Sequence, residues 1–259
     1  MRIAAGLAAL IVTAAATAAD ATDWRPLPWH LIDHTYRIPP AARFHSLDMD
    51  VELTGTPATG DFLYVAPLWG EIGGNGFYFG LQTDIWDGHC PCYRGKGAIF
   101  SRWGRASLAD ARPVAAGWSE ALDAAHSAEN AYAGVRLPYG WRGGAYHFHL
   151  AAQDTADGGC WVDLTITEDA SGRTDDVGSL HFPRCGPVMP SPVSFVEVYG
   201  RNAPAPPRIP TLTVRFHGPV VNGQPIVSAG SWYIPTGVPP VARPELEDDG
   251  MSVSFPGRM

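Results

Sequence analysis

Alternation of apolar and polar residues, interrupted by glycine, proline and aspartate, is the feature that most constrains how this chain can fold. In the stretch GFYFGLQTDIW, residues 76–86, Phe77 and Phe79 alternate with Tyr78 and, further on, Gln82. Successive side chains of a β-strand point to opposite faces of the sheet. The pattern therefore predicts a strand with one core face and one face that mixes aromatic and polar groups.

The same alternation recurs along most of the chain, with turn residues between the repeats. It predicts strands at 46–55, 61–69, 76–86, 97–104, 112–119, 133–141, 145–154, 160–169, 176–185, 193–200, 211–220 and 225–234. Many short strands at regular spacing are typical of an all-β, antiparallel two-sheet sandwich or jelly roll. The segment 120–134 is rich in alanine and glutamate but has no continuous apolar stripe. We expect it to form one irregular or short-helical loop.

The two ends of the chain differ from this pattern. The first residues place Arg2 before an apolar run and then the small residues Ala16-Thr17-Ala18, which is typical of a secretory signal peptide. We therefore predict a signal peptide at 1–18 and a β-sandwich domain at 24–235. The Pro-rich, acidic residues 236–259 are expected to be a weakly ordered tail. The protein is then secreted, either extracellular or periplasmic.

Composition excludes several classes of partner. The formal net charge is −8, so a phosphate backbone is a poor ligand and we expect no nucleic acid partner. Beyond the leader, no window is apolar enough for a membrane span. GGNGFYFG has the wrong spacing for a dinucleotide site, and the chain has no Gly-x-Ser-x-Gly element. We expect no cofactor.

Four cysteines fit an oxidising compartment. A hairpin centred near Gly172 would bring Cys160 and Cys185 opposite each other, which favours a disulfide between them and leaves Cys90 to pair with Cys92. In the alternative pairing, Cys90 and Cys92 both cross to the hairpin cysteines. A zinc site made of the four thiolates is disfavoured, because the spacing is not that of paired Cys-x-x-Cys elements.

Five short motifs occur in an order that resembles a known family. They are GFYFGLQT, GAIFSRWG, VRLPYGWRGGAYHFHL, VGSLHFPR and SFVEVYG. Together they resemble an uncharacterised extracellular domain family, a domain of unknown function found in bacteria and some eukaryotes, over about residues 48–233. The resemblance implies a concanavalin-A-like sandwich, often joined to secreted sugar-associated modules, with no established activity. The segment 128–132 departs from the family's Gly-Glu-Gly-Thr-Gly pattern and keeps only Glu129.

Three carboxylates form the first candidate site. Asp48, Asp50 and Glu52 alternate along one predicted strand and should share a face roughly 6.5–7 Å apart. Retaining glycosidases use a carboxyl pair at a slightly shorter separation, so Asp50 and Glu52 are candidate catalytic residues. The competing interpretation is a solvated edge strand on which charges deter aggregation.

Two histidines form the second candidate. His147 and His149 in YHFHL lie on one strand face, opposite inward-facing Tyr146, Phe148 and Leu150. Such a pair needs a third ligand to hold a metal, for which His89 or Asp163 would serve. A plain polar outer face is the favoured interpretation of the pattern, and no metal is assigned.

The third candidate is an aromatic and acidic strand face with Trp161, Asp163 and Thr165. An outward indole beside a carboxylate suits sugar binding, because the ring stacks on C–H groups while the acid accepts hydroxyl hydrogen bonds. In the alternative, the next loop covers Trp161.

These candidates give three functional hypotheses. The favoured one is a secreted, non-catalytic binder of carbohydrate or cell-envelope glycan, through a face built from Tyr78, Gln82, His147, Trp161 and Asp163. The second is a glycoside hydrolase or lyase on the same scaffold, using Asp50 and Glu52. The third is a structural or protein-contacting surface domain.

Overall fold

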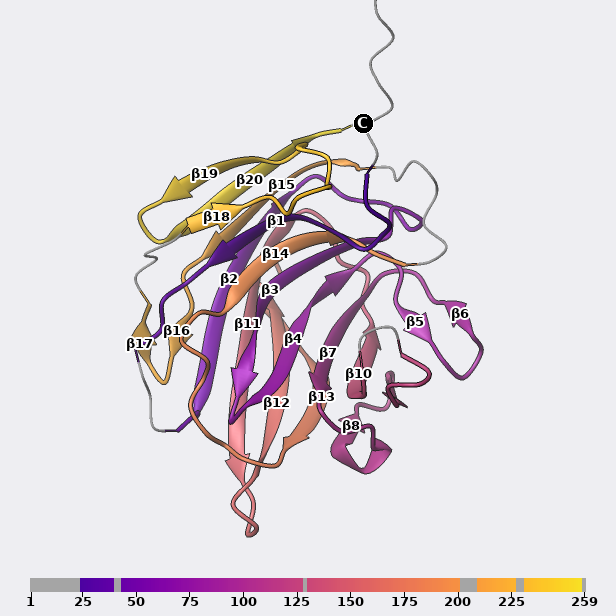
Figure 1. The fold of residues 1–259 in the computed structure, drawn as a ribbon, viewed down its shortest axis with the longest axis vertical. Helices are drawn as coiled ribbons and strands as arrows, with labels where there is room; N and C mark the ends of the chain where they lie inside the picture. The colour runs from indigo at the N-terminus through magenta and orange to yellow at the C-terminus, as the bar shows by residue number, and fades with distance from the viewer. Residues whose placement is uncertain (1–23, 40–42, 128–129, 201–208, 227–230, 258–259) are drawn as a thin grey trace, which may run out of the picture.

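The computed structural model describes residues 24–39, 43–127, 130–200, 209–226 and 231–257. These residues form two large antiparallel sheets packed face to face, so the predicted two-sheet sandwich is confirmed (Figure 1). The proposed signal peptide and Glu129 lie outside the described residues. Within the described ranges, no helix is long and apolar enough to cross a membrane.

Sheet A faces the viewer in Figure 1. Its strand order is β18 (Ser231–Tyr233), β1 (Trp29–Thr35), β14 (Val193–Val198), β3 (Leu63–Ile72), β4 (Asn75–Gln82), β7 (Gly97–Trp103), β10 (Tyr132–Pro138) and β9 (Trp118–Leu122). A two-stranded ribbon, β5 (Trp86–Asp87) and β6 (Cys92–Tyr93), lies beyond the end of β4.

Sheet B lies behind sheet A. Its strand order is β19 (Arg243–Glu247), β20 (Gly250–Pro256), β15 (Thr211–His217), β2 (Ser46–Thr54), β11 (Gly144–Asp154), β12 (Cys160–Glu168), β13 (Arg173–Phe182) and β8 (Ala111–Pro113). The short strands β16 (Val220–Val221) and β17 (Gln224–Pro225) extend it beside β2, and the 3-10 turn η1 (Leu108–Asp110) precedes β8. The segment between β9 and β10 has no helix in its described residues.

The core follows from the alternation. Phe77 and Phe79 from sheet A are fully buried, as are Phe148 and Leu150 from sheet B. The Phe79 and Phe148 rings meet across the interface with centroids 5.6 Å apart. Burying side chains of this size stabilises the folded state by about 1.5–3 kcal/mol each, so inter-sheet packing holds the sandwich together.

The C-terminal segment corrects the predicted domain boundary. Residues 236–259 were expected to be a weakly ordered tail, but β19 and β20 form a hairpin that pairs with β15. Met251, Val253 and Phe255 alternate along β20 and are at most 1% exposed. The apolar face of this strand is therefore part of the core, and the folded region extends to Pro256.

Both favoured disulfides are confirmed. Cys90 bonds to Cys92, and Cys160 bonds to Cys185. The hairpin register differs from the expected one, because Cys160 lies opposite Phe182 and a register shift follows Leu164. Cys185 lies three residues beyond the end of β13 and reaches Cys160 from the connecting segment. Two disulfides fit an oxidising compartment.

A buried histidine in β1 should make the fold sensitive to acid. His34 is 0% exposed, and burial lowers its pKa from 6.5 to about 4. Between pH 4 and pH 6.5 the unfolded chain binds more protons than the folded protein does, because only the unfolded chain's His34 is protonated there. The stability that depends on a neutral His34 is therefore fully present above pH 6.5 and is lost as the pH falls toward 4. At about 1.4 kcal/mol per pKa unit, His34 should lower the free energy of unfolding by about 3 kcal/mol as the pH falls from 6.5 to 4.

Urea unfolding of the wild type and of His34→Gln at pH 7, 5.5 and 4 measures the effect. The free energy of unfolding of the wild type should fall more steeply with acid than that of the variant. Parallel pH curves for the two proteins would show that His34 does not carry the effect.

A candidate ligand groove on the outer face of sheet A

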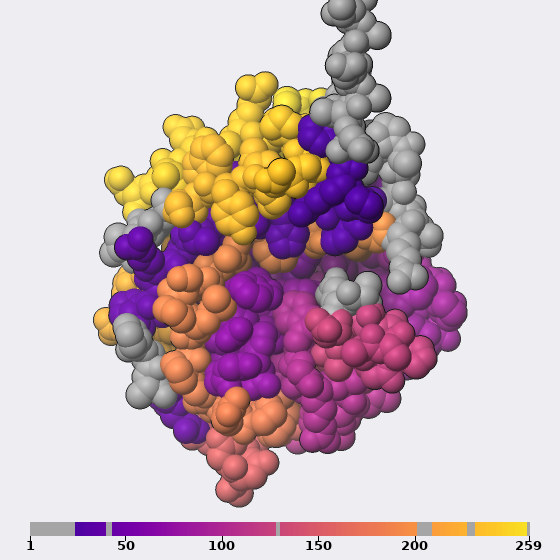
Figure 2. Space-filling model, viewed as in Figure 1, coloured from indigo at the N-terminus to yellow at the C-terminus, as the bar shows by residue number. Residues whose placement is uncertain are grey.

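The outer face of sheet A carries a second aromatic layer, on the side of the sheet that faces away from the sandwich core. Tyr64 and Phe195 are buried there at 1% and 3% exposure, with Trp69 and Tyr78 packed against them. Covering large rings normally needs another layer of structure. Here the side chains cover one another and leave a hollow, which Figure 2 shows below the ridge formed by the C-terminal residues.

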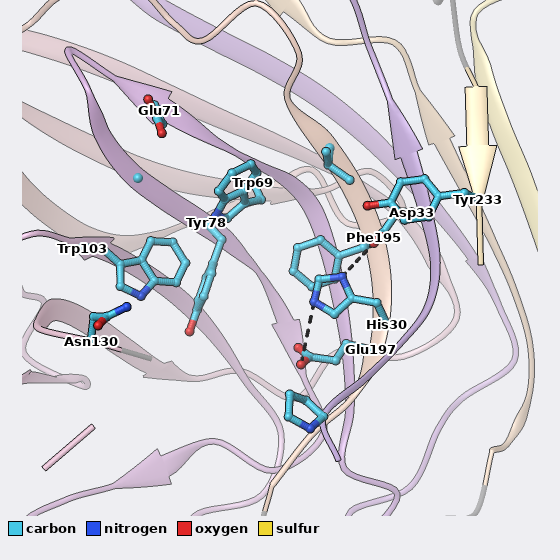
Figure 3. A pocket seen from close by; sticks show the side chains of 13 residues that line it. His30, Asp33, Trp69, Glu71, Tyr78, Trp103, Asn130, Phe195, Glu197 and Tyr233 are labelled. Atoms are coloured by element: carbon cyan, nitrogen blue, oxygen red, sulfur yellow. Dashed lines mark hydrogen bonds and ion pairs between the residues drawn. The ribbon is translucent and has the colours of Figure 1, made fainter. Parts of the chain in front are cut away.

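The hollow is a groove of about 620 Å³, within the range of small-molecule and cofactor sites. It is lined by Pro28, His30, Asp33, Trp69, Glu71, Gly76, Tyr78, Trp103, Asn130, Val193, Phe195, Glu197 and Tyr233 (Figure 3). The lining combines apolar rings with a few polar groups, as ligand sites do.

Ring contacts run across five neighbouring strands of the sheet. His30 on β1 stacks on Phe195 of β14 at 4.3 Å, and Phe195 meets Tyr64 of β3 edge-on at 5.4 Å. Tyr64 contacts Tyr78 of β4 at 5.3 Å, and Tyr78 contacts Trp103 of β7 at 4.6 Å. Four inter-strand spacings give this row a length of roughly 19 Å. Tyr64 is buried beneath the surface, and the other four rings line the groove.

Two glycines on β4 permit this arrangement. A Cβ on Gly76 would lie 3.1 Å from the Trp103 ring, so glycine lets the indole lie close against β4. Gly80 has a φ of +152°, and a Cβ there would lie 2.2 Å from the carbonyl oxygen of Val65, where the register of β3 shifts. Close approach of backbone or rings is a common reason for glycine within a strand.

An imidazole between two carboxylates forms the polar end of the groove. His30 Nδ1 lies 2.7 Å from Asp33 Oδ1, and His30 Nε2 lies 4.0 Å from Glu197 Oε1 (Figure 3). Burial lowers the pKa of His30, but the Asp33 hydrogen bond and the charges of Glu197 and Asp33 outweigh it and leave the pKa raised. Burial, together with Asp33, raises the pKa of the Tyr233 phenol to about 12.

Gln82 and Glu197 flank Tyr64 on the same face. Glu197 pairs with Tyr64 on one side, and Gln82 pairs with Tyr64 on the other. The two outer residues are separated by two inter-strand spacings, roughly 9.5 Å between backbones. Both are largely buried, at 8% for Glu197 and 9% for Gln82. An amide and a carboxylate thus project from one row of the sheet.

The five ligand residues predicted from the sequence do not form one site. Tyr78 and Gln82 lie on sheet A, whereas His147, Trp161 and Asp163 lie on the outer face of sheet B. Two sheets and the core separate the groups. The prediction of one shared face is therefore corrected, and only Tyr78 lines the groove.

Trp161 points outward, as the alternation indicated, but it is partly covered. The guanidinium of Arg112, from β8, lies 3.6 Å from the centroid of its ring, and His181 approaches at 5.3 Å. The neighbouring Asp163 accepts hydrogen bonds from Gln153 and Ser179. Contacts within the protein already occupy this aromatic and acidic pair.

The three carboxylates of β2 are also engaged. Asp50 lies 2.6 Å from His147 Nδ1, and Glu52 lies 3.0 Å from His217 Nε2. Asp48 contacts both His147 and His149. The expectation of an edge strand is corrected, because β2 lies between β15 and β11 within sheet B.

The groove residues that sequence reasoning missed come mainly from β1 and β14. His30 and Asp33 lie before the first predicted strand. Phe195 and Glu197 lie in a predicted strand, and their spacing of two placed them on one face. That spacing was the available signal. Pairing of β1 with β14, which brings the four residues together, is not encoded in any local pattern.

Comparisons with known proteins give structural matches only. No family model matches the chain, and no curated protein matches it. Two structures of scytalido-glutamic peptidase, one with a peptide-based transition state analog and one with a transition state analog inhibitor, are 10% and 12% identical. SCP-B, a member of the Eqolisin family of peptidases in complex with the tripeptide Ala-Ile-His, is 10% identical. Each comparison has a TM-score of 0.43 and covers 88% of this chain and 97% of the other. We assign no residue of the groove from this similarity.

Proposed function

We propose that the protein is an exported binding protein for a neutral glycan chain, which it holds in the groove of sheet A. The observation that carries the proposal is the continuous row of rings across five strands, in which Tyr78 and the terminal ring, Trp103, are half-buried. Aromatic faces stack on the C–H surfaces of sugars, and carboxylates accept hydrogen bonds from hydroxyl groups.

The charge of the groove selects against acidic ligands. Its lining includes the carboxylates of Asp33, Glu71 and Glu197, and within the described lining no lysine or arginine is present. A polyanionic glycan would meet like charges in a partly desolvated site, which costs binding energy. Neutral polysaccharides such as glucans, xylans and mannans are the ligand class that fits.

Replacing Trp103 by alanine should weaken glycan binding by about 30-fold, since truncating a large aromatic contact of this kind costs about 2 kcal/mol. Retention on insoluble neutral polysaccharides, followed by titration with soluble oligosaccharides, measures the loss. Trp161→Ala is the matched control, because this indole lies on the opposite outer face. This variant should bind glycan as the wild type does. Equal losses in both variants, or retention of both, would rule out the groove.

A second candidate function is hydrolysis of an acyl bond at the edge of the groove, between Glu197, which lines it, and Gln82, which lies two strands away in the same row. The observation that favours it is the placement of Glu197 and Gln82 on either side of Tyr64. The Glu197 carboxylate would take a proton from a water whose oxygen attacks the acyl carbon, and would return it to the leaving group. The Gln82 amide would donate a hydrogen bond to the oxyanion that forms.

Glu197→Gln separates binding from hydrolysis. Loss of a general base should lower turnover of a peptide mixture by about 10²–10⁴-fold while glycan or peptide retention persists. Glu247→Gln, at a carboxylate on β19 of sheet B that does not line the groove, is the control and should leave turnover unchanged. Mass spectrometry of the peptide mixture detects cleavage. If the wild type cleaves nothing, the hydrolase candidate is excluded and binding alone remains.

A further inference from the structure

A second cluster of functional groups lies on the outer face of sheet B, on the opposite side of the sandwich from the groove. It consists of Asp48 on β2 and of His147 and His149 on β11. One ligand atom from each of the three lies within 4.8 Å of the other two. We propose that this Asp48–His147–His149 cluster binds a divalent transition-metal ion such as Zn²⁺.

The scaffold places these groups without long loops. His149 lies opposite Asp48, and His147 lies opposite Asp50, on two hydrogen-bonded strands inside sheet B. Residues two apart on a strand share a face, so both imidazoles project to the same side and their rings are nearly parallel, at 14°. Sites built on strands hold their ligands more accurately than sites on loops.

The distances already approach those of a coordination sphere. His147 Nε2 lies 3.3 Å from Asp48 Oδ1, and His149 Nδ1 lies 2.5 Å from the same oxygen. Ligands bound to Zn²⁺ at about 2.0–2.1 Å in a tetrahedron lie roughly 3.3 Å apart. The Asp48–His149 contact must therefore open by less than an ångström. The three side chains are 28–39% exposed, so they have room to move.

Asp50 supplies a feature that a chance His–Asp contact lacks. Its Oδ1 lies 2.6 Å from Nδ1 of His147, the ring nitrogen that does not face Asp48. A metal-binding histidine commonly donates its second N–H to a carboxylate, which fixes the tautomer and makes the ligating nitrogen more basic. Asp50 is thus a positioning residue, and it adds a second negative charge beside the cation.

The ligand set selects the class of metal. Two imidazoles and one carboxylate suit Zn²⁺, Cu²⁺ or Ni²⁺, whereas Mg²⁺ and Ca²⁺ prefer oxygen ligands. Three protein ligands leave at least one coordination position open. On an exposed face that position is available to water or to a carboxylate of another molecule.

Titration calorimetry of the full chain with Zn²⁺, after removal of metals by a chelator, tests the proposal. We expect saturable binding of one ion at this cluster, no comparable binding of Mg²⁺, and ligand-field absorption bands when Co²⁺ replaces Zn²⁺. Asp50→Asn should weaken binding by about 10–100-fold, as expected for loss of a carboxylate that orients a ligand. His149→Gln should abolish the Co²⁺ bands.

His217→Ala is the matched control. His217 is also on the outer face of sheet B and contacts Glu52 and Asp249, but it is not part of the cluster. Zn²⁺ binding to this variant should equal that of the wild type. Circular dichroism verifies that each variant is folded. Absence of saturable Zn²⁺ binding, equal binding by His149→Gln, or an equal loss in His217→Ala would each overturn the proposal.

Discussion

Replacing Asp110 by asparagine should lower the free energy of unfolding by about 3–5 kcal/mol, because it leaves a buried guanidinium without its counter-charge. Arg102 on β7 is 0% exposed, and its Nη2 lies 3.0 Å from Asp110 Oδ2 in the turn η1. Burial lowers the pKa of Arg102 and the charge of Asp110 opposes that change. The turn η1, which carries Asp110, packs against β8, β9 and β13.

Arg102 also contacts the backbone of a groove residue. Arg102 Nη1 donates a hydrogen bond to the carbonyl oxygen of Trp103 at 3.2 Å, and Trp103 lines the groove. Asp110→Asn should therefore also weaken the proposed glycan binding under conditions in which the variant remains folded. Urea unfolding at pH 7, followed by intrinsic fluorescence and circular dichroism, measures the main effect.

Two further variants isolate the buried charge as the cause. Arg105 also contacts Asp110, at 3.4 Å, but its side chain is 66% exposed, and Arg105→Ala should cost less than about 1 kcal/mol. Replacing both partners, as in Arg102→Met with Asp110→Leu, should recover most of the stability, because no unpaired charge is left behind. Similar losses in Asp110→Asn and Arg105→Ala would contradict this explanation.

Alternation in the sequence predicts the orientation of individual side chains well. It placed Phe77 and Phe148 in the core, and it placed Tyr78 and Trp161 on outward faces. This succeeds because strand geometry is local, and the side-chain period of two depends only on the backbone. The same reasoning applied to Met251, Val253 and Phe255 would have shown that the C-terminal segment is a strand.

Strand order is not local, and for this reason the predicted site failed as a unit. Tyr78 and Trp161 both face outward, but from different sheets. Their relative position depends on which strands pair, and pairing is set by packing over the whole domain. The proposed metal-binding cluster also depends on strand pairing. The sequence shows His147 and His149 as a pair, but only the register between β2 and β11 places Asp48 beside them.

The groove illustrates a further limit. Its floor takes one residue each from five strands, and β1 and β14 are separated by most of the chain. No motif of fixed spacing can encode such a row. Composition gave a partial signal, since 11% of residues are aromatic. Some of these rings form the second aromatic layer on the outer face of sheet A.

The two disulfides should differ strongly in their contribution to stability. Cys160–Cys185 closes a loop of 25 residues in sequence, and the chain-entropy relation gives about 3.5 kcal/mol for a loop of that length. Cys90–Cys92 closes a loop of only 2, for which the same relation gives about 1 kcal/mol. Cys160→Ala with Cys185→Ala should therefore unfold at much lower urea concentration than Cys90→Ala with Cys92→Ala.

Binding measurements on the same two variants should show that the Cys160–Cys185 bond stabilises the fold without shaping the groove. Cys160 begins β12 in sheet B, and Cys185 lies near Phe44, with its disulfide sulfur 3.5 Å from the Phe44 carbonyl oxygen. Neither residue lines the groove of sheet A. In the absence of urea the variant should retain wild-type glycan affinity despite its lower stability. Stability and binding of the proposed glycan would then depend on different parts of the molecule. A loss of glycan affinity in this folded variant would contradict that expectation, because it would show that the disulfide in sheet B affects the groove on sheet A.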